Sequence, residues 1–194
     1  MLSEQSFRFN SHPKVEGTHA FLSPSKYHWL RDDAAKLISR LENARATERG
    51  TRLHAWAAEA ITWERYQPRD GDYICQYIND ALDLGLQPEV QLFYSYNCFG
   101  TADTIGFIPA KSFLRVHDLK TGVTKPSFDQ LYVYAAVFCL EYDLRPFEVY
   151  GELRIYQDAE IMVTDIDRAY LAFVYDTIHS HNITIEEWHM GGRA

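Results

Sequence analysis

Alternating apolar and polar positions predict a β-hairpin in the middle of the chain. Residues 102–108 and 112–119 are rich in Ile, Phe, Leu and Val, and a break beginning at Pro109 separates them. Two such runs around a proline-containing break are typical of paired strands. Similar alternation predicts one strand over residues 90–96, before the hairpin, and another over residues 147–156, after it.

Helical periodicity marks the segments around these strands. Ser23 followed by Pro24 is a helix-start signature, with the serine as N-cap and the proline at the first helical position. Gly85 is placed to end a later helix, because glycine readily adopts the left-handed conformation that follows helix ends. The predicted helices cover residues 23–41, 47–65, 72–84, 126–143 and 165–180.

The order of these elements predicts an α/β fold with a mixed sheet flanked by helices. The first three strands would form an antiparallel meander, and the helix at 126–143 would then cross to a fourth strand parallel to the third. We expect a single domain over residues 1–194, with its core in residues 21–157. A short strand is expected at residues 7–9, and residues 191–194 are expected to be disordered.

Composition limits the classes of protein to consider. The 194 residues are 46% hydrophobic and 14% aromatic, which is enough for a substantial core. We expect a cytoplasmic protein, because the sequence shows neither a long apolar run nor a signal-peptide pattern. Cys75, Cys98 and Cys139 are scattered and fit reduced thiols better than disulfides. A net charge of −8 argues against non-specific coating of nucleic acid.

Basic residues are concentrated in the predicted N-terminal helices. Residues 70–110 contain no Lys or Arg, whereas residues 31–52 contain six, together with four acids. Two interpretations stay open: these side chains contact DNA phosphates, or they form a solvated face paired with Glu42 and Glu48. The candidate DNA-binding residues are Lys36, Arg40, Arg45, Arg49 and Arg52.

The predicted hairpin brings two acids together. Asp103 and Asp118 are equally distant from the centre of the hairpin, so a tight turn would place their Cβ atoms about 5 Å apart. Lys120 shares a face with Asp118, since alternate residues of a strand point the same way. Carboxylates that close repel unless one is protonated or a cation lies between them, and oxygen ligands favour Mg²⁺ or Mn²⁺. The alternative is a surface acid near an ordinary Asp-x-Lys pair.

Three further side chains have both a chemical and a structural interpretation. His54 lies beside the apolar stripe of the helix at 47–65, where it is either a ligand or a histidine at the edge of the core. Gln130 and Tyr134 share a helix face. Gln130 alternatively forms a capping box with Ser127, and Tyr134 alternatively packs in the core. His179 and His181 are expected at a helix C-terminus, near the negative end of its dipole.

Taken together, these motifs resemble the RecB-like branch of the PD-(D/E)XK nuclease superfamily. The matching motifs are G-x-x-x-H at Gly50 and His54, G-x-A-D at Gly100 and Asp103, D-x-K at Asp118 and Lys120, and Q-x-x-x-Y at Gln130 and Tyr134. They occur in the family's order, and the resemblance covers roughly residues 21–157. It implies a restriction-endonuclease-like core.

The resemblance also implies roles for these residues. His54, Asp103, Asp118 and the backbone carbonyl of Leu119 would hold one or two Mg²⁺ or Mn²⁺ ions. The catalytic residues would be Asp103, Asp118, Lys120, Gln130 and Tyr134, with Lys120 acting on the attacking water and the last two orienting the phosphate. No iron–sulfur cluster is expected, because the first helix and the region after Cys139 lack cysteines.

The implied activity is that of a DNA exonuclease in recombination, repair or end processing, in a bacterial or phage-infected cell. Expected partners are DNA, a helicase or annealing protein, and further copies of the chain, with no membrane. Three alternatives stay open: a catalytically silent nucleic-acid-binding or assembly module, a structure-specific endonuclease, and a hydrolase of small phosphates.

Overall fold

The computed structural model describes residues 13–15, 20–158 and 160–191, and the chain divides into two compact units, residues 1–48 and 49–194. The strand predicted at residues 7–9 lies outside the described residues, as do residues 192–194 of the predicted disordered tail. A single nuclease domain over the whole chain stays a prediction.

The N-terminal helices differ from the prediction. Two 3₁₀ segments, η1 (Pro13–Val15) and η2 (Pro24–Arg31), precede one long helix, α1 (Ala34–Thr62), in place of separate helices at 23–41 and 47–65. The side chain of Ser23 caps no helix, and the backbone leaves helical geometry at Lys26. Asp33 instead accepts the amide N–H of Lys36 at 2.8 Å, which caps the start of α1. Good helix formers between the two predicted segments then let α1 continue.

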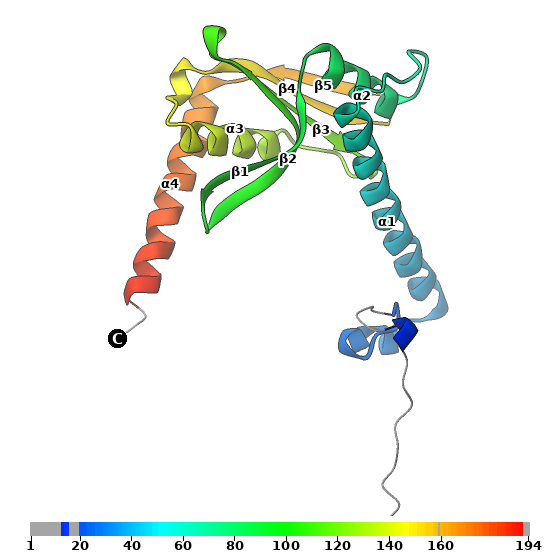
Figure 1. Cartoon of the computed structure of the whole chain (residues 1–194). Coiled ribbons are helices and arrows are strands. Elements are labelled where there is room, and N and C mark those ends of the chain that lie inside the picture. Colours follow the sequence, from blue (N-terminus) through cyan, green and yellow to red (C-terminus); the bar gives the residue numbers. More distant parts are fainter. Residues whose placement is uncertain (1–12, 16–19, 159, 192–194) are drawn as a thin grey trace, which may run out of the picture. The chain divides into compact units, whose positions relative to one another are not determined.

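Five strands form one mixed sheet in the order β1-β2-β3-β4-β5 (Figure 1). Only the β3–β4 pair is parallel, as predicted for the third and fourth strands. This arrangement confirms the α/β class. The strand that the sequence pattern does not predict is β5, a short edge strand with an acid at each end. The strand bounds are Gln87–Ser95 (β1), Cys98–Ile108 (β2), Phe113–Lys120 (β3), Tyr150–Gln157 (β4) and Glu160–Asp165 (β5).

Three more helices accompany the sheet: α2 (Tyr73–Asp83), α3 (Asp129–Glu141) and α4 (Arg168–Gly191). Gly85 follows α2 with a φ of 65°, as predicted for a residue that ends a helix. The predicted end of the last helix near residue 180 is wrong, because no proline or glycine stops α4 before Gly191. His179 and His181 therefore lie within α4 and not at its end, and Nδ1 of His179 is 2.7 Å from the Tyr94 hydroxyl.

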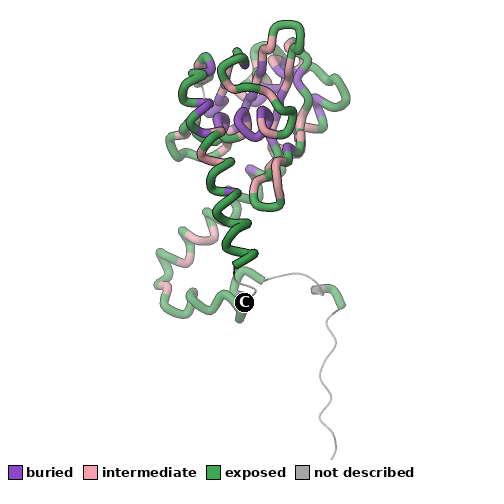
Figure 2. The backbone as a smooth tube through the Cα atoms, turned by 90° about the vertical axis from the view of Figure 1, so that its left-hand side faces the viewer, coloured by how far each residue is buried: buried purple, intermediate pink, exposed green. Residues whose placement is uncertain are grey.

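The core has a layer on each face of the sheet, and the buried residues are concentrated in residues 49–194 (Figure 2). On one face, α3 and α4 pack with Leu114 and Val116. On the other, α2 and the C-terminal half of α1 pack with Leu119 and Tyr156. Leu119 and the apolar residues near the end of α1 thus fix the C-terminal half of this helix beside the end of β3.

Two further features of the structure concern the state of the cysteines and the length and polarity of the helices. Cys75, Cys98 and Cys139 are free thiols, and only Cys139 is fully buried. Within the described residues, no helix is both long enough and apolar enough to cross a membrane.

Candidate metal centre

Three carboxylates lie in a row across β1, β2 and β3. Thr104 pairs with His117, so the next residues outward, Asp103 and Asp118, face each other as the hairpin pattern predicts. Pro88 pairs with Thr104 in the same way, which places Glu89 opposite Asp103 on its other side. Sequence reasoning missed Glu89, because its place in the row depends on the pairing of β1 with β2.

Glu89 has an unusual backbone. Its φ is +51°, in the left-handed region that residues with a Cβ atom rarely adopt. Such a conformation costs about 1–2 kcal/mol and is found preferentially at functional sites. Burial and the neighbouring Asp103 both raise the pKa of the Glu89 carboxyl, whereas His54 lowers it. The backbone outlier and the crowding of charge therefore occur at the same residue.

His54 reaches this row from α1. Its Nδ1 lies 3.4 Å from Oδ2 of Asp103, and this contact raises the pKa of the imidazole. One ligand atom from each of His54, Glu89 and Asp103 can be chosen so that all three lie within 4.8 Å of one another. Oδ2 of Asp103 also accepts the amide N–H of Leu119 at 2.9 Å, which fixes the orientation of the carboxylate. The contact that Leu119 makes here is through its amide N–H to Asp103. The role of its carbonyl as a metal ligand stays a prediction.

Asp118 is the buried member of the row. Its residue is 3% exposed, and its pKa is raised, first by burial and then by the charge of Asp103. The ammonium of Lys120 offsets part of this cost, since its Nζ lies 3.1 Å from Oδ1 and 2.9 Å from Oδ2. Asp118 and Lys120 thus share a face, as the alternation of the strand predicts.

Gln130 and Tyr134 extend this set of polar contacts from α3. Nζ of Lys120 donates to Oε1 of Gln130 at 2.7 Å, and Nε2 of Gln130 donates to the Tyr134 hydroxyl at 3.5 Å. The capping-box alternative for Gln130 is wrong: α3 has no side-chain cap, and Ser127 contacts Asp129 instead. The Gln130 amide is therefore available to the site.

The two motif glycines make room for residues of other motifs. A Cβ atom on Gly50 would lie 2.6 Å from Oγ1 of Thr121, the residue after Lys120. A Cβ atom on Gly100 would lie 3.2 Å from Cε1 of Tyr134. Larger side chains at these glycines would displace the loop after Lys120 and the ring of Tyr134, respectively. The four motifs, far apart in sequence, therefore meet at one place in the fold.

The donor set fits a small divalent cation. It combines one imidazole nitrogen with carboxylate oxygens, which suit Mg²⁺ and Mn²⁺. Ligands on opposite sides of Mg²⁺ are about 4 Å apart, close to the 4.8 Å within which the atoms of His54, Glu89 and Asp103 lie. In addition, the buried Oδ2 of Asp118 accepts no well-oriented hydrogen bond among the described residues, despite the nearby Lys120. A cation held by His54, Glu89 and Asp103 would reduce the repulsion along the row, although Asp118, predicted as a ligand, lies outside this group of three.

A further residue, Gln157, fixes the loop after Lys120. It pairs with Lys120 in the β3–β4 register, and its Nε2 donates to the carbonyls of Gly122 and Thr124. The residue is only 9% exposed, which restricts its rotamers. Sequence reasoning missed Gln157, because a glutamine at the end of a strand gives no signal of what it contacts.

The predicted DNA-binding residues are divided between the two units. Lys36 and Arg40 both form ion pairs with Asp32, at 3.2 and 2.5 Å respectively. These pairs favour the interpretation of Lys36 and Arg40 as a paired face. The partner is Asp32, in place of the predicted Glu42 and Glu48. Arg45 belongs with them in residues 1–48, whereas Arg49 and Arg52 begin the second unit. All three of these arginines are exposed, and contact with DNA stays a prediction.

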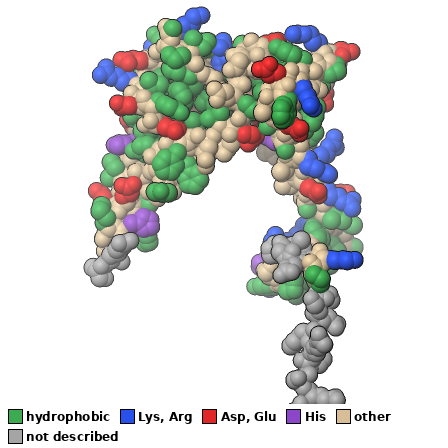
Figure 3. Space-filling model, viewed as in Figure 1, with side chains coloured by type: hydrophobic (Ala, Val, Ile, Leu, Met, Phe, Trp, Pro, Cys, Tyr) green, Lys and Arg blue, Asp and Glu red, His purple; other side chains and the backbone are tan. Residues whose placement is uncertain are grey.

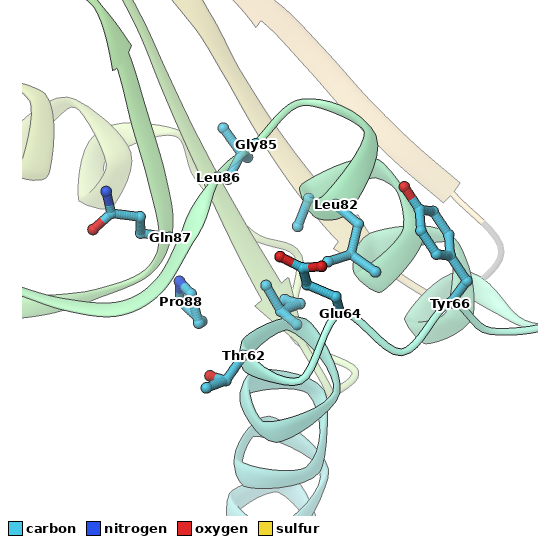
Figure 4. Close-up of a pocket in the computed structure, with 10 residues that line it drawn as sticks. Thr62, Glu64, Tyr66, Leu82, Gly85, Leu86, Gln87 and Pro88 are labelled. Carbon is cyan, nitrogen blue, oxygen red and sulfur yellow. The ribbon is translucent and has the colours of Figure 1, made fainter.

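A cavity of about 480 Å³ lies where α1 ends, between α2 and the start of β1 (Figure 4). Leu82, Leu86 and Pro88 contribute to its wall, and Glu64 is the acid among the described lining residues. Those lining residues include no Lys, Arg, His or Cys. The cavity therefore offers no second set of metal ligands.

Comparison of the chain with protein-family models, with curated proteins and with solved structures finds no match.

Proposed function

We propose that the chain is a divalent-metal-dependent DNA nuclease with a restriction-endonuclease-like core. The observation that carries the proposal is the row of Glu89, Asp103 and Asp118, with His54 beside it and Lys120 paired to its buried end. Three carboxylates this close are stable in ionised form when a cation lies among them. Mg²⁺ or Mn²⁺ bound there supplies charge stabilisation on a scissile phosphate and a more acidic water.

Each protein group has a proposed role. His54, Glu89 and Asp103 would hold the ion, and Asp118 and the Leu119 carbonyl are the further ligands that the resemblance implies. Lys120 lies between the acids and Gln130, so its ammonium can position the attacking water and offset the charge that develops on the phosphate. Gln130 and Tyr134 orient the phosphate from α3.

The resemblance to RecB-like nucleases favours an exonuclease that trims DNA ends in recombination, repair or end processing. It is the motif set, and not the geometry of the centre, that supports exonuclease over endonuclease activity. A helicase, an annealing protein or further copies of the chain would supply processivity.

The test is degradation of linear DNA labelled at the 5′ or the 3′ end, beside a closed circle, with Mg²⁺, Mn²⁺ or EDTA. We expect metal-dependent loss of linear DNA alone, with the order of label release giving the polarity. Cutting of the circle would replace exonuclease with endonuclease activity.

The matched control is Asp118→Asn, which removes a charge from the row and preserves the size of the side chain. It should abolish cleavage while the circular-dichroism spectrum stays that of the parent. If the parent cuts nothing with any of these metals, the nuclease proposal fails and a silent binding module takes its place. Turnover of free nucleotides with indifference to DNA length would instead indicate a hydrolase of small phosphates.

A further inference from the structure

The described part of the N-terminal unit exposes aromatic and aliphatic side chains that packing among those residues does not use. Among residues 20–48, Ser23 is the only buried residue. Phe21 is 42% exposed, Tyr27 55% and Leu30 69%. A segment of this kind has no core of its own to account for its aromatic residues. Some of them are therefore available to a ligand.

Two of the aromatic residues line a cavity of about 410 Å³ within this unit, a volume in the range of small-ligand sites. Phe21 and Trp29 contribute rings, and Lys26 and Arg40 contribute positive groups. The indole N–H of Trp29 donates to the carbonyl of Ser23 at 3.1 Å, which fixes the ring at the wall of the cavity. The remaining lining residues are Ala20, Asn43 and Ala44.

The charge around this cavity is positive. Arg40 and Lys36 share the carboxylate of Asp32, whose side chain is 1% exposed, and the neighbouring Asp33 caps α1. The charged residues among the described lining of the cavity are Lys26 and Arg40, and both are positive. Over the sequence, residues 1–48 contain seven Lys and Arg against six Asp and Glu, whereas the rest contains 12 against 21. Figure 3 shows Lys and Arg side chains on the N-terminal segment and along α1, interspersed with hydrophobic ones.

Aromatic rings beside positive groups match the chemistry of an unpaired nucleotide. A base without its partner exposes a flat face that stacks on Trp or Phe, while its phosphate is attracted to Lys and Arg. A duplex offers its phosphates but keeps its bases stacked inside. The cavity is therefore better suited to a single strand than to a double helix.

We propose that the cavity formed by Phe21, Lys26, Trp29 and Arg40 binds an unpaired nucleotide of a DNA strand. The proposal deepens the proposed nuclease function and rests on DNA being the substrate. Phe21 and Trp29 stack on the base, and Lys26 contacts the adjoining phosphate, while Arg40 stays paired with Asp32 at the wall of the cavity. This binding needs no metal ion.

The test uses the full chain carrying Asp118→Asn, in EDTA, so that binding is measured without cleavage. Fluorescence anisotropy of labelled oligothymidylate gives the dissociation constant, and a blunt hairpin duplex of equal length is the comparison. Trp29→Ala and Phe21→Ala should each weaken single-strand binding about tenfold or more. Lys26→Ala should reduce the slope of log affinity against log salt by about 0.7.

Two substitutions are matched controls. Leu30→Ala changes an exposed residue of the same segment that does not line the cavity, and Trp63→Ala removes an exposed tryptophan from the other unit. Both should leave the affinity unchanged. Trp29→Phe retains a stacking ring without the N–H donor, so it should keep most of the affinity even if Trp29→Ala perturbs the segment.

Equal binding by the Phe21→Ala, Trp29→Ala and Leu30→Ala proteins would overturn the proposal. Tighter binding of the duplex than of the single strand, or competition by thymidine monophosphate as effective as by the oligomer, would also overturn it. The outcome of this binding test is separate from that of the nuclease test. If the parent binds single strands but shows no metal-dependent cleavage, only the nuclease proposal is refuted. If the parent cleaves DNA but the Phe21 and Trp29 substitutions leave binding unchanged, only the proposal for the cavity is refuted.

Discussion

Replacement of Glu89 by Gln should stabilise the metal-free protein and weaken its response to metal. Glu89 contributes a negative charge to the row but makes no hydrogen bond with the described residues that the substitution would remove, and Gln has almost the same size. Because Gln is also a residue with a Cβ atom, the strain of the +51° φ is the same in both proteins. The substitution therefore isolates the charge.

The size of the metal-free effect follows from the distance. Ligand atoms of Glu89 and Asp103 lie within 4.8 Å of each other, where two unit charges repel by about 1 kcal/mol in a water-like medium and by about 3 kcal/mol at an effective dielectric constant of 20. Glu89 is exposed, so solvent screening makes the lower value the appropriate one. A gain of about 1 kcal/mol corresponds to a rise of about 2–4 °C in Tm for a protein of this size.

With metal, the effect has the opposite sign. An ion present at 100 times its Kd adds about 2.7 kcal/mol to the free energy of unfolding of the parent. If loss of one ligand weakens binding of the ion about tenfold, the same ion concentration adds only about 1.4 kcal/mol to the free energy of unfolding of the Glu89→Gln protein. The metal-induced rise in Tm should therefore fall by about half.

The assay is thermal unfolding followed by circular dichroism, in EDTA and over a series of Mn²⁺ and Mg²⁺ concentrations. Glu64→Gln is a matched control, since Glu64 is likewise an exposed glutamate with a φ of 51°, but it is not part of the cluster. Glu64→Gln should change neither the Tm in EDTA nor the metal-induced rise in Tm. The reasoning would be refuted by a parent protein whose Tm does not change with either metal. It would also be refuted by a Glu89→Gln protein that has the parent's Tm in EDTA and the parent's full metal-induced rise.

Three other predictions test the centre and its surroundings. Lys120→Ala should lower the initial rate of DNA cleavage by at least about 100-fold while the protein stays folded, because its ammonium, which contacts Asp118 and Gln130, is proposed to position the attacking water and to offset charge on the phosphate. A retained rate would contradict this role. Gly100→Ala should lower the free energy of unfolding, measured in urea, by about 1 kcal/mol, because the new Cβ atom crowds Tyr134. This loss should disappear in a Tyr134→Ala background, and an equal loss in both backgrounds would contradict the contact. Burial beside Arg154 and Arg115 lowers the pKa of His117 to about 3, so the unfolded chain binds a proton that the folded chain excludes. The His117 contribution to the free energy of unfolding should therefore fall by up to about 1.4 kcal/mol per unit as pH drops from about 6.5 toward 3, measured as the difference from His117→Leu; parallel pH profiles would contradict it.

The hairpin could be predicted because its two strands are related by simple local geometry. Alternation fixes which residues share a face, and a short turn fixes which residues are opposite. Those two facts were enough to pair Asp103 with Asp118 and to place Lys120 beside them. The parallel fourth strand followed from the helix that precedes it.

Glu89 could not be predicted, because a bulge decides its position. Ser95 pairs with Cys98, yet Phe93 pairs with Phe99, so the register of β1 against β2 shifts by one residue between them. Without that shift, Glu89 would align with Thr104 and point to the other face of the sheet. A bulge depends on how the whole hairpin twists and packs, and the local sequence carries no clear signal for it.

The row of acids also weighs against a silent module. A sheet gains nothing in stability from three neighbouring carboxylates, and each of Glu89 and Asp118 has a raised pKa that reflects the cost of ionising it there. Neutral residues at these positions would fold more stably, and a residue with less strain would serve at position 89. The same groups would become favourable with a divalent cation bound, since His54 and Lys120 already orient them. The row is thus costly for the fold alone, and the proposed cation would offset that cost. The first variant to measure is therefore the one that removes the charge of Glu89 and leaves everything else in place.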